Sequence, residues 1–234
     1  MPSVSTSDTA AESQGAVAYR RIEVSPERLR GWIESFGRRH GALTASESGA
    51  LVTFRAAGGA LATCHVPFPP LAPPDGDAGP LALADRVAAH ATADRTVGVL
   101  LVRLGGYAAG VFTGPGPVLA ASKVGSRLVH GRSAAGGQSQ QRFARRRQKQ
   151  SREALTAAAD TAAAVFAPYR LDVLVLGGDR RAMARVRGDV RLAPYFERES
   201  EVFLTVPDPR LTVLKDTPRL FRAVRIDLTE AGLA

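Results

Sequence analysis

The residues best suited to chemistry lie in one short segment, where two glycines are followed directly by a glutamine. The segment reads His130-Gly131-Arg132-Ser133-Ala134-Ala135-Gly136-Gly137-Gln138-Ser139. Paired glycines permit positive φ and a close approach of the backbone to a ligand. A glutamine amide can orient a water molecule, and the backbone N–H can donate to a developing negative charge, but the side chain is not a base. The candidate catalytic residues are therefore Gly136, Gly137 and Gln138.

The positive charge of the chain is concentrated around this segment. The formal net charge is +9, yet no acidic residue lies between Asp94 and Glu153, where eleven Lys and Arg are found. Such a segregated positive field predicts a surface that faces phosphates, with a solvated basic face as the alternative. The candidate RNA-binding residues are Arg127, Arg132, Arg142, Arg145, Arg146, Arg147, Lys149 and Arg152.

A long helix is predicted immediately after the glycines, because nothing from Gln138 to Ala167 breaks a helix and Pro168 closes it. Its later half can form a packing stripe from Ala154, Leu155, Ala158, Ala162, Val165 and Phe166. Its earlier half, residues 138–152, has only Phe143 and Ala144 as nonpolar members. We expect the earlier half to project from the body, with its charge offset by something outside the chain.

The remaining elements alternate between strand and helix composition. Helices are predicted from Ser25-Pro26 onward and at 81–91 and 179–187, and a helical or strand segment near 219–228 ends the fold. Strands are predicted at 50–56, 60–66, 97–102, 108–112, 118–123, 171–176 and 202–206. This order predicts an α/β layered domain with a mixed sheet.

Three regions are expected along the chain. Residues 1–15 have no apolar pattern and predict a disordered tail, and residues 16–75 form an N-terminal part with a helix and a β-hairpin. Residues 76–234 form the main domain, which follows a loop rich in proline and glycine. The single cysteine, Cys64, lies in an apolar strand and is expected to be a buried structural thiol.

The glutamine segment resembles the catalytic middle domain of eukaryotic and archaeal class I peptide-release factors. The likeness rests on His130-Gly131-Arg132, on Gly136-Gly137-Gln138-Ser139, and on Arg142-Phe143-Ala144-Arg145 with the arginine after it. The chain departs from those factors by the insertion Ser133-Ala134-Ala135. As a single catalytic domain, it is similar to the bacterial Vms-like release factors, a peptidyl-tRNA hydrolase family.

The resemblance implies an RNase-H-like release-factor catalytic domain from about Val97 onward, here with a small N-terminal α+β extension. It implies a peptidyl-tRNA hydrolase that frees nascent chains from stalled ribosomes, with the loop at 130–141 entering the peptidyl-transferase centre of the large subunit. The partners would be the ribosome and peptidyl-tRNA. No cofactor or metal is expected. In that family RNA supplies much of the catalysis, which would explain why no Ser-His-Asp or Cys-His set is apparent in this sequence. We also expect a cytoplasmic monomer with no membrane segment and no codon-reading domain.

Two alternatives remain open from the residues alone. A ribosome or RNA binder without catalysis would keep the basic helix but would not require the intact glycine pair and glutamine. A nuclease would need several carboxylates converging on two metal ions, for which the spacing of Asp94, Asp172, Asp179 and Asp189 gives no recognisable set. A weaker phosphate-binding signal is the strand that ends in Gly177 and Gly178 before a helix. Because the longer Gly-Lys-Ser/Thr signature is absent, tight packing of the turn is the favoured interpretation.

Overall fold

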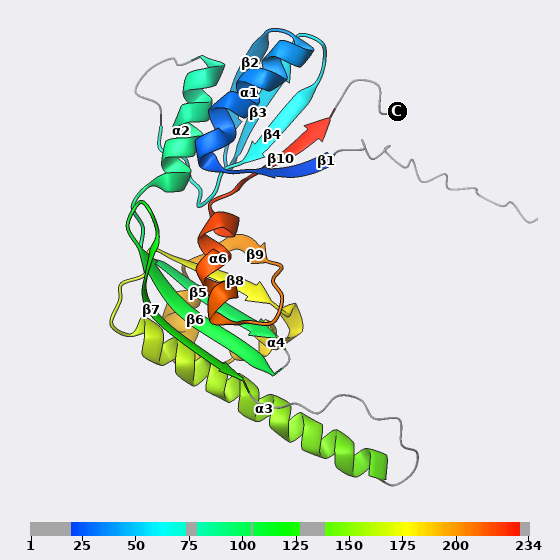
Figure 1. Ribbon diagram of the computed structural model, residues 1–234, viewed down its shortest axis with the longest axis vertical. Helices are drawn as coiled ribbons and strands as arrows, with labels where there is room; N and C mark the ends of the chain where they lie inside the picture. The colour runs from blue at the N-terminus through cyan, green and yellow to red at the C-terminus, as the bar shows by residue number, and fades with distance from the viewer. Residues whose placement is uncertain (1–19, 74–78, 104, 127–138, 230–234) are drawn as a thin grey trace, which may run out of the picture.

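The chain folds into two five-stranded sheets, each with helices packed against it (Figure 1). The computed structural model describes residues 20–73, 79–103, 105–126 and 139–229, except the side chains of residues 139–144, 146 and 147. The predicted disordered tail, residues 1–15, lies outside these ranges. None of the helices in them combines the length and apolar character needed to cross a bilayer.

The first sheet is antiparallel, with the strand order β1-β10-β4-β3-β2. Its strands are β1 (Arg20–Val24), β2 (Leu43–Ser48), β3 (Leu51–Ala56), β4 (Leu61–His65) and β10 (Val224–Thr229). The helices α1 (Pro26–His40) and α2 (Pro80–Thr92) share a core with one face of it. The predicted hairpin is confirmed as β3 and β4, and both predicted helices are confirmed.

The core of this part is built from alternate strand residues and one stripe of each helix. Leu29, Ile33 and Phe36 of α1 are buried, and Trp32 stacks on Phe36 with ring centroids 5.6 Å apart. Cys64 is fully buried in the same core, and burial raises the pKa of its thiol to about 12. The thiol is thus protonated at neutral pH, which confirms its expected structural role.

The second sheet is mixed, with the strand order β7-β6-β5-β8-β9. β5, β6 and β7 form an antiparallel meander, and β8 and β9 run parallel to β5 on its other side. Its strands are β5 (Val97–Arg103), β6 (Gly106–Thr113), β7 (Val118–Ser126), β8 (Val173–Gly178) and β9 (Glu199–Leu204). This is the mixed-sheet α/β domain that the sequence predicts.

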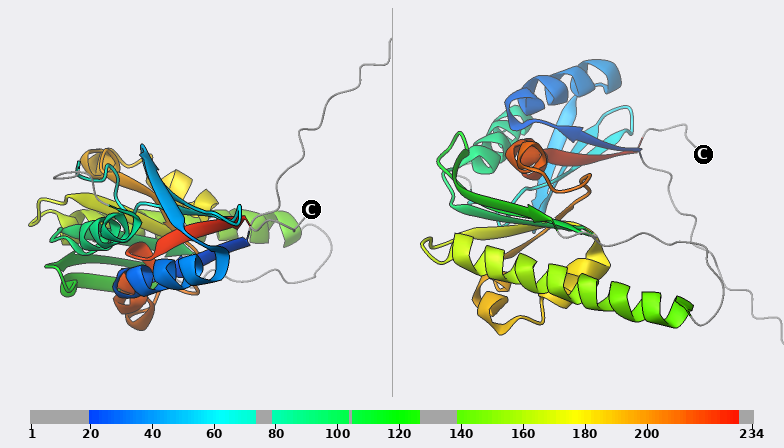
Figure 2. Two further views of the ribbon diagram at one scale, coloured as in Figure 1. Left: turned by 90° about the horizontal axis from the view of Figure 1, so that it is seen from above. Right: turned by 60° about the horizontal axis from the view of Figure 1, so that its bottom comes forward.

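Helices cover both faces of the second sheet, and Figure 2 shows α3 and α6 on opposite sides of it. α3 (Ser139–Phe166), α4 (Arg180–Val186), the 3-10 turn η1 (Val190–Leu192) and α5 (Ala193–Phe196) pack on one face, and α6 (Leu211–Phe221) packs on the other. Leu100 and Val102 of β5 point into the core that the sheet shares with α3 and α4, whereas Val99 and Leu101 point into the core that it shares with α6. Burial on both faces explains why β5 reads as an unbroken apolar run.

The second sheet and its helices form an insertion between α2 and β10 of the first part. The chain leaves the first part after α2, builds everything from β5 to α6, and returns to pair β10 between β1 and β4. Two elements that follow the predicted boundary at residue 76 are associated with the first part: α2 packs on α1, and β10 pairs in the first sheet. The pairing of β10 with β4, about 160 residues earlier, and with β1, about 200 residues earlier, leaves no local sequence signal.

The side chain of Asp227, on β10, contacts both neighbouring strands, β1 and β4. Its carboxylate accepts hydrogen bonds from Nε and Nη2 of Arg21 on β1, at 2.6 and 2.8 Å, and lies 2.9 Å from Nε2 of His65 on β4. The bidentate Arg21 guanidinium, and after it His65, lower the pKa of Asp227 to about 2. Because the folded pKa lies below that of an unfolded Asp, this stabilisation is present above about pH 4 and is lost as the pH falls towards 2.

Replacing Asp227 with Asn should therefore lower the free energy of unfolding by about 1–2 kcal/mol at pH 7, since the charge-assisted bonds become neutral and the group is partly solvated. Urea unfolding at several pH values between 7 and 2 measures this, and the difference from wild type should shrink below pH 4. Asp216→Asn, on an exposed site of α6 with no ion-pair partner among the described residues, is the control. A difference that stays constant down to pH 2 would show that the charge of Asp227 is not the cause.

Candidate nucleic-acid interface

The helix α3 is divided into an anchored half and a projecting half. Its 28 residues extend over about 42 Å, at 1.5 Å per residue. The anchored half buries a stripe of mostly small side chains against β6 and the helices beside it: Ala154, Ala158, Ala159, Ala162, Val165 and Phe166. Small side chains let the helix axis approach the sheet closely. The predicted helix and its packing stripe are both confirmed.

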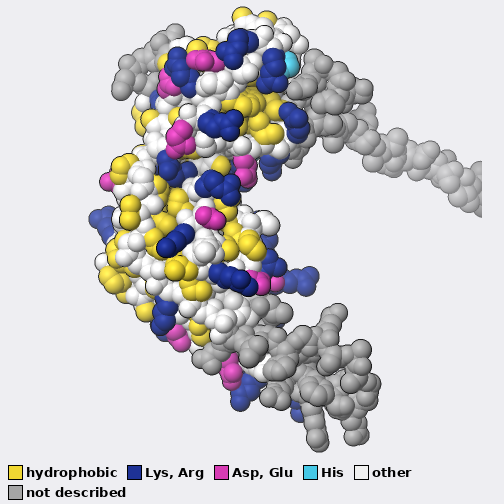
Figure 3. Space-filling view, viewed as in Figure 1, with side chains coloured by type: hydrophobic (Ala, Val, Ile, Leu, Met, Phe, Trp, Pro, Cys, Tyr) yellow, Lys and Arg dark blue, Asp and Glu magenta, His cyan; other side chains and the backbone are white. Residues whose placement is uncertain are grey.

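The projecting half of α3 extends beyond the edge of the second sheet, as Figures 1 and 2 show. Arg145, Lys149 and Arg152 are exposed there, and Figure 3 shows Lys and Arg side chains at this end of the molecule. Lys149 lies 4.0 Å from Glu153, one turn further along the helix, whereas Arg145 and Arg152 have no ion-pair partner among the described residues. The expected projection is therefore confirmed. The binding of RNA by these side chains remains a prediction.

The other predicted site residues lie around the start of α3. Arg142, Arg146 and Arg147 belong to the helix, but their side chains are outside the description. Arg127, Arg132, Gly136, Gly137 and Gln138 lie in the segment 127–138, outside the described residues, as does His130. The structure does fix the two ends of that segment, which are Ser126 at the end of β7 and Ser139 at the start of α3.

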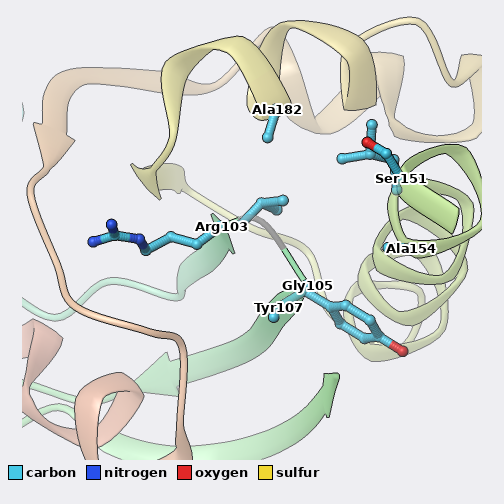
Figure 4. A pocket seen from close by; sticks show the side chains of 9 residues that line it. Arg103, Gly105, Tyr107, Ser151, Ala154 and Ala182 are labelled. Atoms are coloured by element: carbon cyan, nitrogen blue, oxygen red, sulfur yellow. The ribbon is translucent and has the colours of Figure 1, made fainter. Parts of the chain in front are cut away.

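A small cavity lies where the carboxyl end of β5 meets α3 and α4, which is where ligands often bind in open α/β sheets. It is lined by Arg103, Tyr107, Ser151, Ala154, Leu155 and Ala182, among others (Figure 4). Its volume is about 20 Å³, which is room for roughly one water molecule. The guanidinium of Arg103 points away from the cavity and donates to the carbonyl of Val206 at 2.7 Å. This cavity is too small to hold a substrate.

The turn at the end of β8 packs tightly against β5, and its helix amides are capped by the Asp179 side chain. Gly178 has φ +100°, and a Cβ there would lie 2.1 Å from the carbonyl oxygen of Val102. The Asp179 carboxylate accepts hydrogen bonds from the amides of Arg181 and Ala182 at 2.7 and 3.1 Å, which caps α4. A phosphate would have to displace this carboxylate. Of the two readings of the glycine turn, the structure therefore supports tight packing.

The carboxylates considered for a nuclease have structural roles at separate places. Asp172 accepts from the amide of Thr96 at 2.8 Å, at the start of β8, whereas Asp179 lies at the end of that strand, roughly 20 Å away at 3.3 Å per residue. Asp189 caps η1 and binds Arg191, and Asp94 is exposed in the connection between α2 and β5. These residues do not converge on one site.

One contact at the base of α3 could not be found from the sequence. Arg191 of η1 donates to Asp160 of α3 at 2.7 Å and also to Asp189 at 2.7 Å. The separation of 31 residues between Arg191 and Asp160 follows no local motif. This contact helps to fix the side of α3 that faces η1, at the point from which the helix projects.

Residues 95–227, more than half of the chain, match the family described as Actinobacteria/chloroflexi VLRF1 release factor. The match begins two residues before β5 and ends within β10, so it contains the whole insertion and its α3. The chain belongs to the VLRF1 release-factor family. Membership confirms the predicted likeness to Vms-like release factors and indicates a release-factor type of function.

The solved structures similar to this VLRF1 family member include the crystal structure of an archaeal translation termination factor, aRF1. The two share 11% sequence identity with a TM-score of 0.41, over 86% of this chain and 64% of the factor. The chain thus spans less than two thirds of the factor's length. No curated protein matches the chain.

The cap at Asp179 gives a test of whether this carboxylate is structural. Asp179→Ala should lower the free energy of unfolding by about 1 kcal/mol, because two amides at the start of α4 lose their acceptor. Asp179→Ser keeps a capping oxygen and should remain within about 0.5 kcal/mol of wild type. Urea unfolding of both variants measures the effect. An unchanged stability of Asp179→Ala, together with a metal-dependent RNase activity that this variant loses, would instead assign the residue to a nuclease site.

Proposed function

We propose that this VLRF1 family member is a peptidyl-tRNA hydrolase that frees nascent chains from stalled ribosomes. The observation that carries the proposal is the placement of Gly136-Gly137-Gln138 directly before a helix whose cationic half projects from the body. The anchored half of α3 supports this projection, and the cavity at the strand ends is too small for a substrate. The glutamine segment would therefore act inside a partner, and the partner would enclose the reaction.

The partner proposed is the peptidyl-transferase centre of the large ribosomal subunit with peptidyl-tRNA bound. Exposed Arg145, Lys149 and Arg152 can contact RNA phosphates, with Arg142, Arg146 and Arg147 in the same half-helix. Phosphate contacts of this kind position a protein without reading sequence. They would hold the start of α3, and thus the glutamine, at a fixed depth in the RNA. We propose a cytoplasmic monomer for this role.

The chemistry follows from an amide placed beside an ester. Water attacks the carbonyl carbon of the peptidyl ester, the bond to the 3′-terminal ribose oxygen breaks, and that oxygen takes up a proton as the free peptide acid forms. The Gln138 amide would orient the water about 3 Å from the carbonyl, and its backbone N–H would donate near the leaving oxygen. Gln138 is not a base, so RNA groups would supply the proton transfers. Gly136 and Gly137 would let the backbone pass the tRNA end.

Gln138→Ala should reduce single-turnover peptide release from stalled ribosome–nascent-chain complexes by about 10²-fold or more, because one positioned donor is lost. Co-sedimentation with the same ribosomes should be unchanged. Gln141→Ala, which removes the same amide three residues later, is the matched control and should release at the wild-type rate. If wild type and Gln138→Ala both bind and neither releases peptide, the chain is a non-catalytic ribosome binder.

The projecting half should contribute to binding and not to the chemical step. Replacing Arg145, Lys149 and Arg152 together with Gln should flatten the slope of log affinity for ribosomes against log salt by about 2.1–2.7, since each phosphate contact contributes roughly 0.7–0.9. The rate of release at saturating protein should be preserved. The control variant replaces Arg210, Lys215 and Arg219 together with Gln. These residues are exposed on or beside α6, on the opposite face of the sheet, and the variant loses the same charge. Equal slopes for the two triple variants would exclude the half-helix as the contact surface.

A further inference from the structure

The arginines of α4 fall into two groups with different environments. Arg180 lies over the ring of Phe203 at 4.2 Å, and Arg187, directly after the helix, lies over Phe196 at 5.0 Å and pairs with Glu199. These side chains are used in packing on the β9 side. Arg181 and Arg185, one turn apart and both exposed, have no side-chain partner anywhere in the part of the chain that the structure describes.

The orientation of α4 places the second group on the side of α3. Ala182 lines the small cavity together with Ser151 and Leu155 of α3, while Met183 and Val186 are buried (Figure 4). At 100° per residue, Arg185 lies about 60° from Ala182, on the flank nearest α3, and Arg181 points directly to solvent, opposite to buried Met183 and Val186. Arg180 and Arg187 lie on the opposite flank, in agreement with their contacts to Phe203 and Phe196.

The projecting half of α3 carries arginines on the matching flank. Arg145 and Arg152 are seven residues apart and therefore lie on one stripe of the helix, which continues to the buried Ala159. The next residue, Asp160, pairs with Arg191 of η1, the turn that follows α4 in the chain. The stripe thus runs along the side of α3 that faces α4 and η1.

Four acidic residues lie beside this flank, and each has a partner: Glu153, next to Arg152, lies 4.0 Å from Nζ of Lys149, and Asp160, Asp179 and Asp189 bind groups of α4 and η1. Arg191 donates to both Asp160 and Asp189, and its hydrogen bonds hold the pKa of Asp189 below its usual value. Asp179 accepts from two amides of α4. The positive charge of Arg181 and Arg185 is therefore left for an external partner.

We infer that Arg181 and Arg185 form a second phosphate-contact point, which binds the backbone of a folded RNA helix that also contacts Arg145 and Arg152. The inference rests on the proposed function and extends its RNA contact from α3 to the body of the domain. A guanidinium group without an acidic partner can donate two parallel hydrogen bonds to phosphate oxygens. The amides of Arg181 and Ala182 already donate to Asp179, so a phosphate at α4 would be bound by the arginine side chains.

The spacing of the contacts favours folded RNA over a single strand. The distance along α3 from Arg145 to Leu155, which lies beside α4, is about 15 Å. A partner that reaches both points must present phosphates over that span in a fixed arrangement, as a ribosomal RNA helix does. Two contact points that lie off the axis of α3 would also fix its rotation, and therefore the direction in which Gln138 points.

Binding of the full chain to purified 50S subunits over 50–300 mM salt tests the inference. Arg181→Gln with Arg185→Gln should weaken binding about tenfold near 0.1 M salt and flatten the log–log salt slope by about 1.4–1.8, because two phosphates are no longer neutralised. Lys215→Gln with Arg219→Gln, an exposed pair at the same spacing on α6, should change neither. Arg181→Lys with Arg185→Lys should restore the slope. A slope for the Arg181/Arg185 double Gln variant equal to that of wild type would overturn the inference.

The release assay separates this inference from the proposed function. The double Gln variant should release peptide at the wild-type rate once the protein saturates the ribosomes. If Gln138→Ala releases as fast as wild type, the hydrolase proposal fails, and the salt slope still decides whether α4 contacts RNA. If Gln138→Ala is inactive and the double Gln variant keeps the wild-type slope, only the second contact point fails.

Discussion

The packing of the alanine-rich half of α3 against the second sheet is the interaction on which the candidate site depends. An isolated helix with the composition of the projecting half would be marginal in water, because helix nucleation is unfavourable and like charges repel. Here the nucleus is supplied by Ala158, Ala159, Ala162 and Phe166, which are buried against β6 and the helices beside it. The projecting turns add to a helix that already exists. A charged element can thus remain ordered where it has no core to cover it.

The second sheet, on which α3 packs, is held against the first part by contacts at both points where the chain crosses between them. Phe68 lies in the loop after β4, but its ring packs with Phe221 of the second part, while its carbonyl oxygen lies 2.9 Å from Nε2 of His90 on α2. Arg95, in the crossing from α2 to β5, lies over the Phe68 ring at 5.2 Å and donates to the carbonyl of His90 at 2.6 Å. Together with β10, which returns to the first sheet, these contacts connect the two parts at both crossings.

Local patterns predicted most of the fold. The α3 boundaries follow from a run without helix breakers that ends at Pro168, and β5 and β8 follow from short apolar runs. β2 was missed because its sequence, Leu43–Ser48, is mainly polar on an edge strand with one exposed face, and the partners of β10 were missed because its pairing is long-range. For the site, the glutamine motif is visible in the sequence. Two features of the site depend on tertiary packing that no local spacing encodes. One is the ion pair of Asp160 with Arg191, and the other is that some α4 arginines pack on aromatic rings while others are exposed.

A site on a projecting helix is sensitive to its support in a way that an enclosed pocket is not. The start of α3 lies roughly 20 Å beyond Ala154, so a tilt of about 3° at the base would move it by about 1 Å, a displacement that can cost a positioned reaction two orders of magnitude. Under the proposed mechanism, substitutions at buried Ala158 or Ala162 would therefore affect release without touching substrate. Phosphate contacts near the tip, at Arg145, would oppose that tilt most effectively, because they act at the largest distance from the base. A second RNA contact at α4 lies off the axis of α3 and would instead oppose rotation about that axis, which the contacts along α3 oppose only weakly.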